Sequence, residues 1–468
     1  MFSTTKPPAA NAIQCDQEWA ELTAAEPLDR RVRSHRAGFP WMTSCGLVAL
    51  LFVATHDPMA SLHTESPVDD LVSIGLGGAV FRQAALGLIG ILGFFNVLRG
   101  RDPLRLFRSA AGRLLLALVL WATLSLVWSH EPTVTLRALG SSGAMLLFAI
   151  GFMNVYGATA LLRLSFTASL TYLVVGVIAE VSLGVFHPWL SEYRFAGSLN
   201  SNHQAINCAI LLFAAAALAR RARRFEWLCW TLSIIAGAFL LLTKSRTSVA
   251  SVAVALVLLL FVHLWRSKTI AALIAACVIG VASLLYAIFG LSPSAPQRSF
   301  LLLGREDAPI SDLSGRSKLW DLVTPYISSQ KWCCGYGYNT FWTPERHAEI
   351  SEEAGWGVFE GHSAYLDVFL GLGGIGLGVY LSLIVVGCGT AVCRYGLVPS
   401  SESAFVLLVI TFSVFHGVTE SALLHPTLLQ LTFLSCALNL RNRDAREREN
   451  LCGPVHCAAA DKVGPQRP

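Results

Sequence analysis

Apolar segments long enough to cross a membrane follow one another through most of this chain. The 468 residues are 54% hydrophobic and only 14% charged, and their mean hydropathy is +0.56. A water-soluble domain of this size does not normally reach such values. The alternating pattern of a membrane β-barrel is missing, so the backbone polar groups must be satisfied within helices. The sequence therefore predicts an all-α, polytopic membrane protein.

We expect about twelve membrane-spanning helices, because a bilayer core about 30 Å thick requires roughly 20 apolar residues per helix. The first nine fall within residues 41–291, and the last three fall within residues 362–440. The predicted spans are residues 45–55, 84–98, 114–128, 145–155, 164–185, 204–219, 227–242, 249–265, 270–289, 365–387, 405–420 and 428–440. Residues 1–40 and 441–468 are polar and are predicted to form tails at the two ends of the chain.

The distribution of Arg and Lys predicts the orientation, because these residues accumulate in short cytoplasmic loops. Arg clusters occur within residues 30–36, 99–113, 220–224 and 441–448, whereas residues 57–70 contain acids and no Lys or Arg. This alternation predicts that both tails are cytoplasmic. The net charge of +5 then follows from topology, and we expect no nucleic-acid partner.

One long polar segment, residues 292–361, interrupts the apolar series and is predicted to lie on the outer side of the membrane as a large loop. Three motifs stand out in it or at its end. They are Ser314-Gly315-Arg316 followed by Leu319-Trp320, Gly335-Tyr336-Gly337 followed by Phe341-Trp342, and His362 followed by Tyr365-Leu366. A membrane protein with a single large hydrophilic loop commonly carries out its function there.

Three arginines occupy outward positions that the topology does not explain. Arg194 precedes a span, Arg246 lies between two spans, and Arg316 belongs to the long loop. Ionisable groups at such depths are costly and are by default candidates for function, although contact with lipid headgroups is an alternative for each one. The guanidinium fork binds phosphate through two hydrogen bonds and does not lose its charge. Together the three cations fit a diphosphate at the outer face.

His362 is suited to proton transfer near neutral pH, because an unperturbed imidazole titrates at about 6.5. It lies where the long loop returns to the membrane, and a structural role is the alternative on position alone. Glu360 could orient His362, but solvation is its expected role. The chain has no cysteine spacing typical of a zinc site and no nucleotide-binding Gly-rich loop. We therefore expect no metal and no cofactor.

These motifs resemble those of the O-antigen polymerase and ligase superfamily, and most closely its exopolysaccharide polymerase branch. The resemblance extends over about residues 41–440. It implies an integral-membrane glycosyltransferase of the bacterial inner membrane, with one large periplasmic loop. Its substrates would be oligosaccharides on undecaprenyl diphosphate. A chain-length co-polymerase would be a candidate partner, alongside membrane lipid.

The resemblance also implies roles for individual residues. Arg194, Arg246 and Arg316 would hold the diphosphate, and His362 would act on the acceptor hydroxyl as the catalytic residue. The predicted substrate-binding set is completed by three residues of the motifs, which are Gly335, Tyr336 and Tyr365. The family usually has His-Asn at the catalytic position, whereas Ser363 follows His362 here. A hydroxyl replaces an amide, so the contact with the acceptor must differ.

Three functions fit these features. The first is polymerisation of repeat units, in which a growing chain moves from one lipid carrier to the next unit. The second is ligation of a finished glycan to a lipid A core or a protein, which uses the same donor. The third is transport without chemistry, although no repeated halves or paired interrupted helices of the transporter type are evident. The Gly-Arg and Gly-Tyr-Gly motifs favour the polymerase.

Overall fold

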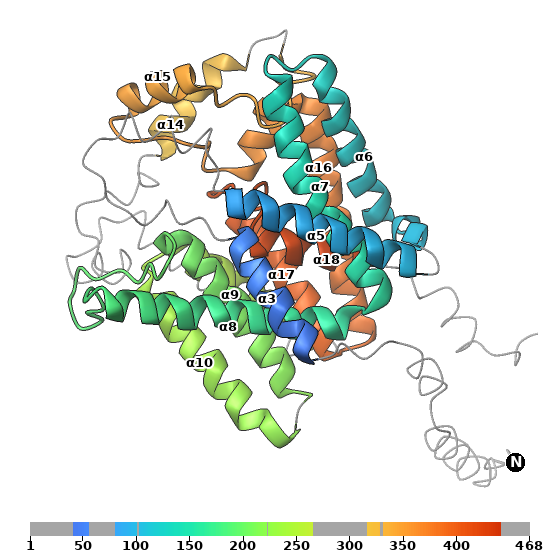
Figure 1. Ribbon diagram of the computed structural model, residues 1–468, viewed down its shortest axis with the longest axis vertical. Helices are drawn as coiled ribbons and strands as arrows, with labels where there is room; N and C mark the ends of the chain where they lie inside the picture. The colour runs from blue at the N-terminus through green and yellow to red at the C-terminus, as the bar shows by residue number, and fades with distance from the viewer. Residues whose placement is uncertain are drawn as a thin grey trace, which may run out of the picture. The chain divides into compact units, whose positions relative to one another are not determined.

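The computed structural model describes residues 41–55, 80–100, 103–221, 223–264, 316–327 and 331–440. This part of the chain consists of helices joined by loops and turns, and it contains no strand (Figure 1). The predicted all-α class is confirmed for these residues. The predicted span at residues 270–289, both tails and residues 292–315 of the long loop lie outside the described part.

Seven of the described helices are long and apolar enough to cross a membrane. They are α5 (Val80–Arg99), α6 (Ala110–Leu124, extended by a 3-10 turn to Val127), α7 (Pro132–Val155), α8 (Ala158–Ser182), α9 (Ser201–Ala219), α11 (Arg246–Leu264) and α16 (Ala364–Leu397). Shorter apolar helices form a second group. They are α3 (Trp41–Thr55), α10 (Glu226–Leu242), α17 (Ser401–His416) and α18 (Leu428–Asn439).

These helices coincide with the predicted spans that fall on described residues, whereas the total of twelve spans stays a prediction. Several boundaries were wrong; the helix predicted to end at residue 387, for example, continues to Leu397. The helix predicted at residues 145–155 begins at Pro132, because a proline at the first turn is compatible with a helix whose first amide needs no partner. The span predicted to end at residue 420 ends at His416, and Gly417 follows it. Glu420 therefore lies in a loop.

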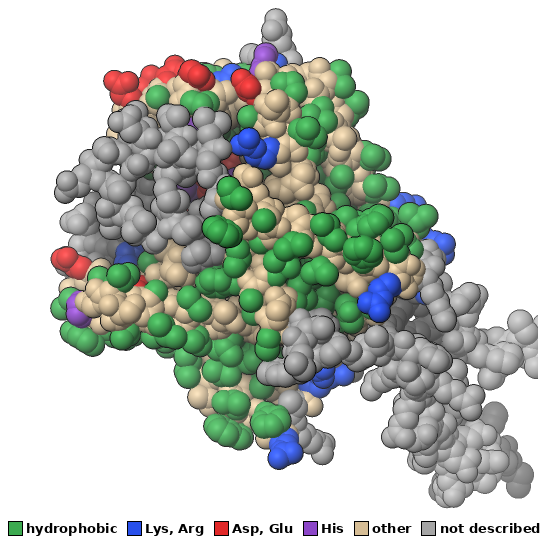
Figure 2. Space-filling view, viewed as in Figure 1, with side chains coloured by type: hydrophobic (Ala, Val, Ile, Leu, Met, Phe, Trp, Pro, Cys, Tyr) green, Lys and Arg blue, Asp and Glu red, His purple; other side chains and the backbone are tan. Residues whose placement is uncertain are grey.

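Apolar side chains cover much of the surface formed by these helices (Figure 2). Phe81, Phe95 and Leu98 of α5 are examples, with exposed fractions of 81%, 58% and 63%. Such side chains would be costly in water, and a hydrocarbon solvent removes that cost. The molecule is a multi-pass membrane protein.

Helix α16 is interrupted at Gly373, whose φ of 67° and ψ of −170° are not helical. The interruption releases carbonyl groups of the preceding turn, and unsatisfied carbonyls are costly inside a membrane. The long loop satisfies two of them: the amide of Tyr336 donates to Leu370 O at 2.9 Å, and the amide of Gly337 donates to Gly371 O at 2.9 Å. The Gly-Tyr-Gly motif is thereby fixed to α16.

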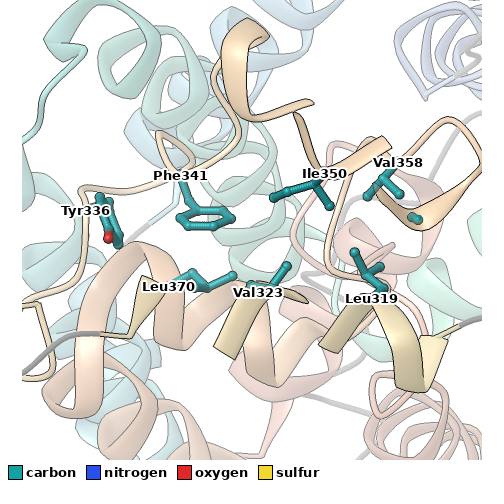
Figure 3. Close-up of a cluster of buried hydrophobic side chains, with 8 residues drawn as sticks. Leu319, Val323, Tyr336, Phe341, Ile350, Val358 and Leu370 are labelled. Atoms are coloured by element: carbon teal, nitrogen blue, oxygen red, sulfur yellow. The ribbon is translucent and has the colours of Figure 1, made fainter. Parts of the chain in front are cut away.

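The described part of the long loop has an apolar core of its own. Its helices α14 (Arg316–Val323) and α15 (Pro344–Ala354) pack together, and Figure 3 shows their side chains meeting those of the loop and of α16. The core consists of Leu319, Val323, Tyr336, Phe341, Ile350, Ala354, Val358 and Leu370. This packing holds Arg316, at the first turn of α14, in a defined place.

Gly335→Ala is expected to destabilise the protein by about 2–4 kcal/mol, because it combines left-handed strain with overpacking. The φ of Gly335 is 67°, and an added Cβ would lie 2.6 Å from Gly371 O and Leu370 O. The measurement is the thermal unfolding midpoint of the purified protein in detergent. Gly378→Ala is the control, because a Cβ added at this position in α16 would have no neighbouring atom within 4 Å. Equal midpoints for the two variants would contradict the packing described for Gly335.

Candidate active site

His362 occupies a strained position immediately before α16. Its φ is 46°, in the left-handed region that non-glycine residues rarely adopt. The next residue, Ser363, caps α16 by accepting a hydrogen bond from the amide of Leu366 at 3.4 Å, and the amide of Ala364 donates to Gly417 O at 2.9 Å. The cap and this contact with the end of α17 keep the backbone of His362 in place. Strain of this kind costs about 1–3 kcal/mol and is found preferentially at functional sites.

Glu420 links three separate segments of the chain through one buried carboxylate. Its side chain is only 4% exposed, and its Oε1 atom accepts from the guanidinium of Arg316 and from Asn202 Nδ2, the latter at 2.8 Å. Its Oε2 atom lies 3.6 Å from His362 Nδ1. The carboxylate thus joins the long loop, the first turn of α9 and the entrance to α16.

The Nδ1 atom of His362 lies close to two carboxylates. Glu360 Oε1 is 3.5 Å away and Glu420 Oε2 is 3.6 Å away. The other oxygen of Glu360 is 2.8 Å from His425 Nε2. The negative charges favour the tautomer with its proton on Nδ1, which leaves Nε2 as the basic nitrogen. Solvation was the wrong expectation for Glu360, because its side chain is only 18% exposed and contacts two histidines.

The charges in this cluster shift the pKa values of its members. Burial disfavours the imidazolium of His362, but the interaction with Glu420 and the charges of Glu360 and Glu420 outweigh burial and raise its pKa above 6.5. Burial likewise opposes ionisation of Glu360, but the hydrogen bond and charge of His425 outweigh it and lower the pKa to about 2. The pKa of Glu420 is lowered for the same kind of reason, burial being outweighed by His362 and Arg316. Both carboxylates are therefore ionised at neutral pH.

His362 is the predicted catalytic base. The enzymatic rate is therefore expected to rise as the pH increases through the raised pKa of His362. Below this pKa the imidazole is protonated and cannot accept a proton, and above it the neutral base is available. Glu360→Gln removes one negative neighbour, so the inflection of the pH–rate profile is expected to move to lower pH. The measurement is the initial rate against pH, with Glu352→Gln of exposed α15 as the control. An inflection unchanged by Glu360→Gln would mean that the profile reports another group.

The structure places Arg194 and Arg246 at neighbouring junctions. Arg194 lies in the loop before α9, where its Nε atom donates to Thr243 O at 3.3 Å. Thr243 ends α10, and Arg246 begins α11 three residues later. The buried carboxylate of Glu180 fixes the loop by accepting from the amide of Gly197 at 2.7 Å. The same loop continues into α9, where Asn202 contacts Glu420.

The other predicted binding residues have structural partners. Gly335 packs on α16, and the hydroxyl of Tyr336 donates to Tyr326 O at 2.8 Å. Tyr365 donates from its hydroxyl to Val414 O at 2.9 Å and so ties α16 to α17. These contacts account for the three motif residues without substrate. Their role in substrate binding stays a prediction.

The residues that the sequence interpretation did not select are Glu420, His425 and Asn202. Glu420 had a usable signal, because an acid inside a predicted apolar span is a functional candidate. His425 and Asn202 had no comparable signal, since each is polar at a helix end. Their roles come from the approach of segments that are distant in the chain: Asn202 contacts Glu420 and His425 contacts Glu360.

The fold and the cluster together define a class: a multi-pass, all-helical membrane protein with a buried arginine, histidine and carboxylate site where its helices end. Residues 231–381 match the family described as O-antigen ligase. This match to about a third of the chain supports the resemblance to the O-antigen polymerase and ligase superfamily inferred from the motifs. The matched segment includes Arg246, Arg316 and His362. A comparison with curated proteins found no match.

Proposed function

We propose that this protein polymerises lipid-linked oligosaccharide repeat units at the periplasmic face of the bacterial inner membrane. The donor would be a glycan on undecaprenyl diphosphate, and the product would be an exopolysaccharide or O-antigen chain. The observation that carries the proposal is the pairing of Arg316 and His362 on the single carboxylate of Glu420. A cation suited to a diphosphate and an imidazole suited to a hydroxyl are thereby held side by side.

The proposed chemistry needs charge neutralisation more than a general acid. A glycosyl diphosphate contains its own leaving group, and fixed cations stabilise the charge that develops on it. Arg194, Arg246 and Arg316 would bind this diphosphate. His362 would take the proton of the acceptor hydroxyl as that oxygen attacks the anomeric carbon from the opposite face. The anomeric configuration would then be inverted.

Arg316 has to serve both Glu420 and the substrate in this proposal. A guanidinium has five N–H donors, and the contact with Glu420 uses its NH2 group. The remaining donors can bind phosphate oxygens while the ion pair persists. Glu420 would thus fix the distance between the diphosphate site and the catalytic imidazole.

The proposed orientation is supported by the surface charge. Acidic side chains gather over α14 and α15 in Figure 2, and α15 contributes four exposed glutamates, Glu345, Glu349, Glu352 and Glu353. Helix α5 instead ends at Arg99, and Arg220 follows the last residue of α9. Because arginine and lysine are retained on the cytoplasmic side, the long loop would face the periplasm.

We also propose that the reaction is independent of metal. Glu360, His362 and Glu420 offer ligand atoms within 4.8 Å of one another, a spacing that a divalent ion could use. However, both carboxylates already have cationic partners, Arg316 and His425, which a metal ion would have to displace. We expect an unchanged rate after dialysis against EDTA. A loss of rate that added Zn²⁺ or Mn²⁺ restores would contradict this expectation.

Ligation is the second candidate, because the matched family is described as O-antigen ligase. Transport without chemistry is less well supported, since a flippase has no evident need for an imidazole held between two carboxylates. The test is a gel of surface and lipid-linked glycan from a deletion strain. The strain is complemented with the wild type, His362→Ala or Arg246→Ala at matched protein levels.

Single repeat units on the carrier, in the deletion strain and with both variants, would support polymerisation. Long chains that accumulate on the carrier would indicate a ligase. Full activity of both variants would exclude the proposed catalytic roles.

A further inference from the structure

A cavity of about 220 Å³ is lined by Glu360, and His362 is not among its lining residues. The long loop forms one wall, with Tyr338, Phe341, Trp342 and Phe359, and the beginning of α16 forms another. Val134, in the first turn of α7, closes the cavity from a third direction. Its volume equals that of roughly seven water molecules at about 30 Å³ each, which is the scale of one sugar ring.

The lining combines aromatic faces with acceptor groups. Glu360, His425 and Asp367 supply polar atoms, and no Lys or Arg is among the lining residues that the structure describes. A diphosphate is therefore unsuited to this cavity, because two carboxylates would repel it. An acyl chain is also unsuited, because ionised groups would lose their solvation against it. A sugar ring satisfies both features, since its C–H faces pack on aromatic rings and its hydroxyls donate to carboxylates.

The principal aromatic wall is held rigidly. Trp342 donates from its indole nitrogen to Asp367 Oδ1 at 2.9 Å, and the same carboxylate accepts from the amide of Gly361 at 3.0 Å and from the hydroxyl of Ser421. The indole ring also stacks on His347, with ring centroids 5.5 Å apart and an interplanar angle of 22°. A fixed ring of this kind loses little entropy on binding a ligand.

The cavity and the catalytic imidazole share one residue. Glu360 lines the cavity, its Oε2 atom contacts His425 there, and its Oε1 atom lies 3.5 Å from His362 Nδ1. A ligand in the cavity is therefore separated from His362 by a single carboxylate. The arginines proposed to hold the donor diphosphate contribute nothing to its walls.

We propose that this cavity binds an uncharged sugar ring of the incoming repeat unit and so holds the acceptor in the neighbourhood of His362. The inference rests on the proposed function, because it assigns the acceptor subsite of the same reaction. Donor and acceptor would thus be bound by different groups, the diphosphate by arginines and the acceptor by the aromatic cavity.

The test measures binding of oligosaccharides obtained by partial acid hydrolysis of the host's own surface polysaccharide. Saturation-transfer NMR on the full-length protein in detergent gives the affinity. Val134→Trp fills the cavity and is expected to weaken binding by about tenfold or more, because a blocked site loses its contacts outright. Leu136→Trp is the matched control, since Leu136 lies on the same helix and is 62% exposed. Phe359→Ala, at a 52% exposed wall residue, should weaken binding without affecting folding.

Loss of binding in Val134→Trp and Phe359→Ala, but not in Leu136→Trp, would support the assignment. Equal binding by all variants, no binding by the wild type, or displacement of the oligosaccharide by undecaprenyl phosphate would overturn it. The proposed function is tested independently of this cavity: it is contradicted if the deletion strain still makes full-length polymer. In that case a cavity-dependent affinity would still identify a sugar site.

Discussion

Replacing His362 by Gly is expected to lower the rate of glycan transfer by about 10²–10⁴-fold, the usual contribution of a positioned general base. The variant should remain folded. Glycine relieves the strain of the positive φ at this position, and Glu420 and Glu360 keep Arg316 and His425 as partners. The measurement is the initial rate with purified full-length protein, together with its thermal unfolding midpoint.

His187→Ala is the control, because this histidine is exposed in the loop between α8 and α9. It should retain the rate of the wild type. If His362→Gly unfolds at a lower temperature than the control, its low rate would be explained by instability. A rate close to that of the wild type would remove His362 from the chemistry.

Arg316→Met is expected to destabilise the protein by about 3–5 kcal/mol, because it leaves the carboxylate of Glu420 buried without its ionic partner. The side chains of the pair are only 11% and 4% exposed. Asn202 and His362 still contact Glu420, which places the expected loss at the lower end of this range. The thermal unfolding midpoint in detergent is the measurement.

The double variant Arg316→Met/Glu420→Leu separates stability from function. Replacing both members of a buried pair by apolar residues is often neutral or stabilising, so its midpoint should return towards that of the wild type. Its activity should not return, because neither the cation proposed to bind phosphate nor the carboxylate beside His362 remains. Recovery of activity would show that the pair is structural alone.

Arg221→Met provides the control for the single variant. Arg221 also pairs with a glutamate, Glu402, but its side chain is 41% exposed. An exposed pair contributes about 1 kcal/mol or less. Similar midpoints for Arg316→Met and Arg221→Met would contradict the account of a buried pair.

The sequence predicted the helices well because long apolar segments have few alternatives in a bilayer. It could not predict where each helix ends, since that depends on local polar contacts. The example with the largest consequence is α17. The apolar pattern continued to residue 420, but the helix ends at His416, and Glu420 enters the site from a loop.

The sequence predicted those site residues that are charged or ionisable in an apolar or membrane-facing context. Arg316 and His362 were selected as ionisable groups at the outer face, and the structure joins both to Glu420. Asn202 and His425 lie among polar residues, so the sequence does not mark them as unusual. Their roles arise only because the fold brings α9 and the loop before α18 to the beginning of α16. The order of residues along the chain does not reveal this proximity.

The most direct test of polymerisation uses the purified full-length protein and lipid-linked repeat units isolated from a strain that lacks it. The products are separated by length on a gel after a fixed time. We predict a ladder of longer glycans with the wild-type protein and no lengthening with His362→Gly. Unchanged single units with the active wild-type protein, or the same ladder from the His362 variant, would contradict the proposal that this site polymerises the glycan.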